Sequence, residues 1–135
     1  MPFPYRGEYK KLDDDARESA SGTFIELSKG LTHYRLFGPQ SGKTVVFIHG
    51  IAGPLGIWQH VTDPLRRQGF QILQYDLYGR GYSDRPDGPY DIDLYINQLH
   101  DLLSGLSIEL PVTLVCWSLG GDDICWLCST ASKAD

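Results

Sequence analysis

The stretch "VCWSLGG", residues 115–121, decides the fold class of this 135-residue chain. A short apolar run leads into Ser118, and Gly120 and Gly121 follow close behind. This pattern is typical of a tight turn from a β-strand into an α-helix, where small neighbours let a serine hydroxyl project. Cys116 stands where a glycine is usual, so the pattern is strained at that position. The stretch predicts Ser118 as a nucleophile, and an ordinary helix N-cap is the alternative.

Apolar strands precede this stretch at regular intervals. "TFIEL" and "LTHYRLF" flank the turn "SKG" and predict a hairpin. "TVVFI" is a continuous β-branched run, as expected for a strand buried on both faces. "FQILQYDL" and "PVTLVCW" predict two further strands.

Two helices are expected between these strands. The first, over residues 57–68, carries Ile57, Val61 and Leu65 on one face and is predicted to restart at Pro64. The second, with Leu99, Leu102 and Leu103 at helical spacing, has Asp91 or Asp93 as its N-cap. The alternation of strands and helices predicts an α/β fold with a mostly parallel sheet.

Three glycine-rich loops leave the carboxyl ends of the expected strands, and we expect them to converge at one edge. They are "HGIAG", "DLYGRGYSD" and "SLGG". Acyl transfer needs N–H donors aimed at the developing oxyanion. The backbone of Leu119 would supply one, and Ile51, or alternatively Ala52, the other. His49 and Gly50 are interpreted as residues that organise this loop, and a role of His49 as the catalytic base is the alternative.

The second loop holds residues that resemble catalytic ones but lack the right context. Ser83 has Gly81 two positions before it and Arg85 two positions after it, in a loop instead of a strand-to-helix turn. Asp76 ends a strand, and we interpret it as an organiser of the loop. The sequence therefore favours Ser118 over Ser83 as the nucleophile.

Composition excludes several classes of function. The net charge is −5 and the 12 Lys and Arg residues are scattered, so no nucleic-acid partner is expected. There is no apolar signal region and no run long enough to span a membrane, which predicts a cytoplasmic protein. The three cysteines, Cys116, Cys125 and Cys128, are interpreted as incidental thiols. No metal or cofactor is expected, and no feature indicates an oligomeric state.

Taken together, "TVVFIHGIAG", "YDLYGRGYSDRP" and "LVCWSLGG" resemble the N-terminal half of an α/β-hydrolase. The resemblance covers about Thr23 to Gly121 and is nearest to the monoacylglycerol lipase and carboxylesterase-like branch. It implies a strand order of 1-2-4-3-5, Ser118 as nucleophile, and Ile51 and Leu119 as oxyanion donors. The implied substrate is a small-molecule ester or a lipid-like ester. The peroxidase, C–C hydrolase and aminopeptidase branches also carry a serine and stay open.

The chain departs from that family after the elbow. The family's acid and histidine follow the nucleophile in chain order, whereas all four histidines here precede Ser118. We also expect this chain to lack the cap and the C-terminal strands of the family. Asp122 and Asp123 enter where the family has a buried helix. We therefore expect three segments: a polar N-terminal arm (1–22), the N-terminal half of a hydrolase domain (23–121), and a divergent tail (122–135).

Three hypotheses about function follow from these observations. The first is a serine hydrolase family member whose triad is incomplete, so that this chain alone is inactive. The second is a non-catalytic truncated fragment or gene-model product. The third is a small-ligand binding module that keeps the fold.

Overall fold

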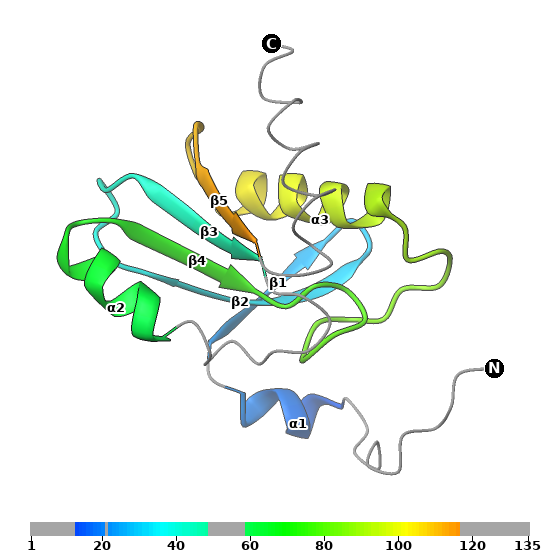
Figure 1. The fold of residues 1–135 in the computed structure, drawn as a ribbon. Coiled ribbons are helices and arrows are strands. Elements are labelled where there is room, and N and C mark those ends of the chain that lie inside the picture. Colours follow the sequence, from blue (N-terminus) through cyan, green and yellow to red (C-terminus); the bar gives the residue numbers. More distant parts are fainter. Residues whose placement is uncertain (1–12, 21, 49–58, 117–135) are drawn as a thin grey trace.

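The computed structural model describes residues 13–20, 22–48 and 59–116, and five strands and three helices lie within these ranges (Figure 1). The strands are β1 (Thr23–Leu27), β2 (Gly30–Phe37), β3 (Thr44–Ile48), β4 (Gln71–Tyr75) and β5 (Thr113–Cys116). The helices are α1 (Asp14–Glu18), α2 (Gln59–Arg67) and α3 (Ile92–Gly105).

The strands form one mixed sheet in the order β1-β2-β4-β3-β5, so the predicted strand order is confirmed. β1 and β2 form the expected hairpin, and β2 pairs antiparallel with β4. β3 pairs in parallel with β4 on one side and β5 on the other. The prediction of an α/β fold is therefore also confirmed, but the sheet is mixed and not mostly parallel, because two of its four strand pairings are antiparallel.

Helices cover both faces of the central strands, which explains why β3 and β4 are buried along their whole length (Figure 1). Val46, Ile48 and Leu73 belong to one core cluster together with the buried leucines of α3. Val45 and Ile72 lie on the other face, where Leu65 of α2 packs. Neighbouring residues of a strand point to opposite faces, so each face receives alternate side chains.

α3 begins and packs as its sequence predicts. The Asp91 side chain caps the helix by accepting a hydrogen bond from the Leu94 backbone N–H at 3.0 Å, which settles the choice between Asp91 and Asp93. Leu99, Leu102 and Leu103 are buried against the sheet. These leucines lie at the i, i+3 and i+4 spacing of one helical face.

α2 differs from its prediction in two respects. It runs through Pro64 instead of restarting there. Pro64 is an interior position, so it removes one hydrogen bond of the helix without ending it. Val61, predicted on the buried face, is 48% exposed, whereas Thr62 is 2% exposed. The side of α2 that meets the sheet is therefore centred on Thr62 and Leu65, one turn apart.

α1 lies within the predicted N-terminal arm. The Asp13 side chain caps it by accepting a hydrogen bond from the Ala16 N–H at 2.9 Å. Asp14 and Asp15 occupy the first turn, where the helix dipole favours acids.

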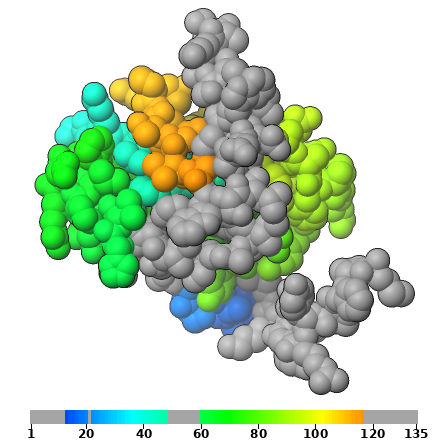
Figure 2. All heavy atoms as spheres, in the orientation of Figure 1, coloured from blue at the N-terminus to red at the C-terminus, as the bar shows by residue number. Residues whose placement is uncertain are grey.

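Figure 2 shows the heavy atoms in the same orientation as Figure 1. α2 forms one margin of this face, and the segment that leads into α3 forms the opposite margin.

Candidate functional site

The carboxyl ends of the three parallel strands form one row. Ile48, the last residue of β3, pairs with Tyr75 of β4 on one side and with Cys116 of β5 on the other. The chain continues from this row into the segments that start at residues 49, 76 and 117. The three strand ends from which the glycine-rich loops leave are therefore adjacent, whereas the loops after β3 and β5 lie outside the described residues.

The residues predicted to carry the chemistry lie outside the described residues. They are His49, Gly50, Ile51 and its alternative Ala52, together with Ser118, Leu119, Gly120 and Gly121. In the sequence, His49 directly follows the last residue of β3, and Ser118 comes two residues after the last residue of β5. The assignment of these residues to a nucleophile and an oxyanion site stays a prediction.

The loop after β4 is described, and Asp76 organises it as predicted. One oxygen of its carboxylate accepts a hydrogen bond from the Tyr82 backbone N–H at 3.0 Å. The same oxygen lies 2.9 Å from Nδ1 of His33 on β2. The side chains of His33 and Asp76 are both buried, so this contact is shielded from water. The carboxylate thus ties the start of the loop to its far limb and to the neighbouring strand.

Ser83 completes a serine, histidine and aspartate cluster that is structural. Its hydroxyl donates to the Asp76 backbone carbonyl at 2.6 Å and accepts from the His33 backbone N–H at 3.0 Å. A nucleophilic serine needs its hydrogen bond from the imidazole ring of the base, and must be reachable by substrate. Ser83 is 0% exposed, and its contacts are to main-chain groups. This geometry supports the interpretation that Ser83 is not the nucleophile.

Gly81 shows why one position of this loop requires a glycine. Its φ of +51° lies in the left-handed region, and an added Cβ would stand 2.2 Å from an oxygen of Asp76. A side chain at this position would displace the carboxylate that organises the loop.

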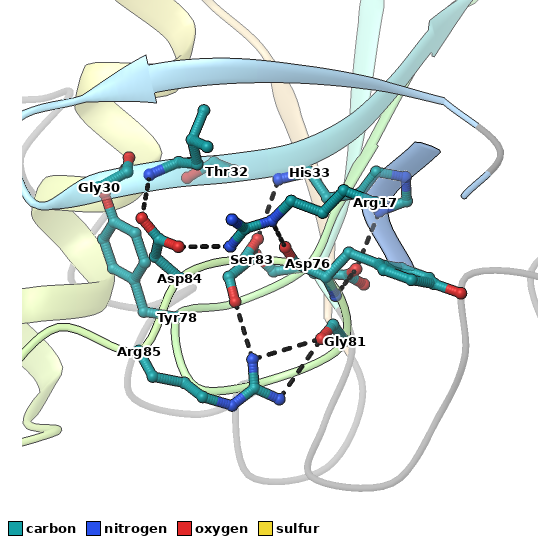
Figure 3. A network of polar contacts seen from close by, with 12 residues as sticks. Arg17, Gly30, Thr32, His33, Asp76, Tyr78, Gly81, Ser83, Asp84 and Arg85 are labelled. Carbon is teal, nitrogen blue, oxygen red and sulfur yellow. Dashed lines mark hydrogen bonds and ion pairs between the residues drawn. The ribbon is translucent and has the colours of Figure 1, made fainter. Parts of the chain in front are cut away.

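α1 is fastened to the same loop by one arginine (Figure 3). The Arg17 guanidinium forms an ion pair with Asp84 and donates to the Tyr82 carbonyl at 3.3 Å. The other oxygen of Asp84 accepts from the Leu31 backbone N–H of β2 at 2.8 Å. Asp84 therefore joins α1, the loop and the sheet. No local pattern predicts this contact, because Arg17 and Asp84 are 67 residues apart.

Gln98 of α3 holds the base of the loop from the other side. It is 1% exposed, and its amide N–H group donates to the Asp76 backbone carbonyl and to the Thr32 hydroxyl, both at 3.1 Å. Its amide oxygen accepts from the Tyr78 N–H at 3.0 Å. Every strong hydrogen-bonding atom of this buried side chain thus has a partner, as burial requires.

Two tyrosines near the loop have shifted acidity. Burial raises the pKa of Tyr78, because the phenolate would be poorly solvated there. Burial likewise raises the pKa of Tyr95 in the first turns of α3. Both phenols therefore stay protonated to a higher pH than an exposed tyrosine would.

Other candidate residues are accounted for as follows. His60 and His100 are exposed on α2 and α3. Cys116 is in a disulfide, so its interpretation as an incidental thiol was wrong.

Among residues 13–20, 22–48 and 59–116, no group of three potential ligands is arranged to hold a metal. The helices in that part of the chain are all too short or too polar to cross a membrane.

Comparison with known proteins points to a hydrolase fold, in agreement with the observed strand order. A family model described as "alpha/beta hydrolase fold" matches residues 43–134. An uncharacterized protein of Mycobacterium tuberculosis is 42% identical over 88 residues, which cover 65% of this chain and 25% of that protein. A non-heme chloroperoxidase of Kitasatospora aureofaciens is 35% identical over 83 residues, covering 62% of this chain and 30% of that protein.

Among solved structures, an esterase of Exiguobacterium antarcticum superimposes with a TM-score of 0.66 at 29% sequence identity. The match covers 74% of this chain and 37% of the esterase. The chain thus spans between 25% and 37% of the length of these three proteins.

Proposed function

Because the chain belongs to the alpha/beta hydrolase fold family, we propose that it carries the nucleophile half of a serine hydrolase site for carboxylic esters. Ser118 is the nucleophile, and the backbone N–H groups of Ile51 and Leu119 stabilise the oxyanion. The substrate is a small ester or a lipid-like ester, as in the carboxylesterase and monoacylglycerol lipase branch.

This proposal rests on the adjacent carboxyl ends of β3, β4 and β5. Ile48 pairs with Cys116, so the two strands are adjacent and parallel where they end. Ile51 is three residues beyond Ile48, and Ser118 is two residues beyond Cys116. A chain advances at most about 3.6 Å per residue, which keeps both residues within roughly 11 Å of their paired strand ends. An oxyanion donor and a nucleophile from these two segments can therefore reach the same carbonyl group.

Activation of Ser118 needs a base, and the described histidines are not placed to provide it. His33 is buried against Asp76, and His60 and His100 are exposed on the two covering helices. We propose that the 135 residues alone do not activate Ser118, and that a histidine and an acid from further segments complete the site.

The test uses a fluorophosphonate probe, which labels only an activated serine. We expect the 135-residue chain alone to stay unlabelled. We expect labelling in a chimera in which residues 1–121 are followed by the corresponding C-terminal part of the Exiguobacterium antarcticum esterase. The substitution Ser118→Ala should abolish that labelling. Ser104 is an exposed serine of α3, and the control substitution Ser104→Ala should leave the labelling unchanged. If the chimera with Ser118→Ala is still labelled, the assignment of Ser118 as the nucleophile is wrong.

The chloroperoxidase relative favours a second candidate, a peroxide-dependent reaction at the same serine. The same chimera distinguishes the two. Hydrolysis of p-nitrophenyl acetate without peroxide supports the esterase. Halogenation of an organic acceptor that needs both peroxide and Ser118 supports the alternative.

A further inference from the structure

The guanidinium of Arg17 is held by three groups that lie outside its own helix. It forms an ion pair with Asp84 (Figure 3). Its Nε donates to the Tyr82 carbonyl at 3.3 Å, and its Cζ lies 5.8 Å from the ring centre of Phe24. A carboxylate, a carbonyl oxygen and an aromatic face are the groups to which a guanidinium binds well. The Arg17 side chain is 15% exposed, so these groups and their surroundings enclose most of it.

The three groups are fixed by contacts that do not involve α1. Asp84 donates its backbone N–H to the Leu31 carbonyl at 2.8 Å, and its second carboxylate oxygen accepts from the Leu31 N–H at 2.8 Å. The Tyr82 backbone N–H is bound by Asp76 at 3.0 Å. Phe24 belongs to β1, which pairs with β2 along its whole length. The arrangement is therefore preorganised and does not need Arg17 to form.

α1, in contrast, is weakly attached. It has five residues, none of them buried, and isolated helices shorter than about 12 residues are marginal in water. Within the described residues, the side-chain hydrogen bonds and ion pairs between α1 and the rest of the chain come from Arg17. Residues 13–18 carry four carboxylates and one guanidinium, which give a net charge of −3. This charge opposes contact with Asp84, so the docking of α1 depends on Arg17.

We propose that the Asp84 carboxylate, the Tyr82 carbonyl and the Phe24 ring form a recognition site for an arginine in a basic segment of a partner protein, and that Arg17 blocks this site from within the chain. When α1 detaches, the partner's arginine makes the contacts that Arg17 made. The far limb of the 76–91 loop is then held in both states, by α1 or by the partner. The site includes none of the residues of the proposed ester site.

The chemistry of the partner follows from the competition with α1. Arg17 is six residues from Thr23, the first residue of β1, and so short a tether gives an effective concentration on the order of millimolar. The cost of ordering α1 lowers the concentration that a competitor needs. An arginine in a basic segment lacks the carboxylates of residues 13–18, and the net charge of −5 on the chain attracts it.

The test is an NMR titration of the full chain with N-acetyl-arginine amide, which presents one guanidinium and no carboxylate. N-acetyl-lysine amide has the same charge but lacks the planar fork of donors. In the variant Arg17→Ala, we expect the arginine probe to shift the backbone amide signals of Tyr82 and Asp84 in a saturable way. The lysine probe should bind about 2- to 12-fold more weakly, the value of one net hydrogen bond. The parent chain should bind the arginine probe about tenfold more weakly than the variant, because Arg17 occupies the site.

Two aspartates of the same loop locate the binding. In the Arg17→Ala background, Asp84→Asn removes the charge but keeps an oxygen for the Leu31 N–H, and it should weaken the arginine probe by about tenfold. Asp87 is exposed on the same loop, and Asp87→Asn should leave the affinity within about twofold.

Hydrogen exchange of the parent chain provides a measurement that needs no variant. The arginine probe should speed exchange of the Ala16 and Arg17 N–H groups, which both donate to Asp13, because it displaces α1. The Leu31 and Asp84 N–H groups should stay protected, because the site itself stays formed. The lysine probe at the same concentration should speed the exchange of α1 less.

Several results would overturn the proposal. One is the absence of saturable shifts in a folded Arg17→Ala variant, and another is equal affinity of this variant and the parent chain. Equal binding of the two probes, or equal losses in Asp84→Asn and Asp87→Asn, would mean general attraction of cations to an acidic chain. Faster exchange at Leu31 together with α1 would mean that the guanidinium only unfolds the protein. If Arg17→Ala does not fold, the exchange of the parent chain decides alone.

None of these results depends on labelling of Ser118, so this proposal and the hydrolase proposal fail separately.

Discussion

The Ser83 hydroxyl satisfies two buried main-chain groups that belong to different parts of the sheet. It accepts from the N–H of His33 in β2 and donates to the carbonyl of Asp76 at the end of β4. The residues next to Ser83 in the sequence were enough to predict that it is not the nucleophile. The contact with His33, 50 residues away, could not be predicted, because nothing local encodes it.

Removal of this hydroxyl tests its structural role. We expect Ser83→Ala to lower the free energy of unfolding by about 1–3 kcal/mol, because the buried His33 N–H loses its hydroxyl acceptor. Urea unfolding followed by circular dichroism measures the change. Ser104→Ala on the exposed side of α3 should stay within about 0.5 kcal/mol of the parent chain. Equal effects of the two substitutions would contradict the role assigned to Ser83.

The residues between α2 and the sheet show what residue-level patterns hide. Arg35 of β2 lies opposite Gln74 of β4, and Arg66 of α2 lines a cavity together with both. Their meeting depends on strand pairing and helix packing, which become known only with the structure.

At the scale of elements, hydrophobic spacing predicted α3 well and α2 poorly. α3 buries three leucines, so a strong apolar stripe fixes its orientation. In α2 a threonine replaces the expected valine at the sheet, and Val61 is left exposed. Nine residues with one proline carry too few apolar positions to define a face.

The two aspartates before and in α3 give a matched test of capping. Asp91→Ala removes the side-chain acceptor of the Leu94 N–H and should lower the free energy of unfolding by about 1 kcal/mol. Asp93→Ala removes only a charge in the first turn, which is worth about 0.3–1 kcal/mol and is screened by salt. Unfolding measured at low and high salt checks this: the Asp93 effect should shrink with salt, and the Asp91 effect should persist. A salt-sensitive Asp91 effect would argue against a cap.

At the scale of the whole molecule, the order of the strands and the two-sided burial of the sheet followed from the sequence. Continuous apolar runs, glycine-rich loops and intervening helices are global patterns that many residues specify together. The loop network rests on Arg17, His33 and Gln98, each at least 20 residues from its partners in the loop. Single polar contacts of this kind leave no periodic pattern in the sequence, so pattern analysis does not predict them.

The raised pKa values of Tyr78 and Tyr95 predict how stability depends on alkaline pH. The folded chain holds both phenolic protons more tightly than the unfolded chain does. Their contribution is complete below the unfolded pKa of about 10 and is lost as pH rises through the raised folded values. The free energy of unfolding should therefore fall above pH 10 or so.

Two tyrosine variants check this pH dependence by urea unfolding across the alkaline range. Tyr78→Phe should reduce the alkaline fall, since its buried phenol can no longer ionise. Tyr90→Phe, at a side chain that is 44% exposed, should leave the fall unchanged. A fall of the same size in Tyr78→Phe as in the parent chain would show that this phenol does not contribute.

The contact between Arg17 and Asp84 also bears on proteolysis. Trypsin cuts after arginine, but it must first draw the side chain into its own binding pocket. The Arg17 side chain is 15% exposed and is held by Asp84 and the Tyr82 carbonyl, whereas Arg66 is 49% exposed. Cleavage after Arg17 requires release of this contact. Its rate therefore reports how often α1 detaches from the loop, a local opening that bulk unfolding measurements average away.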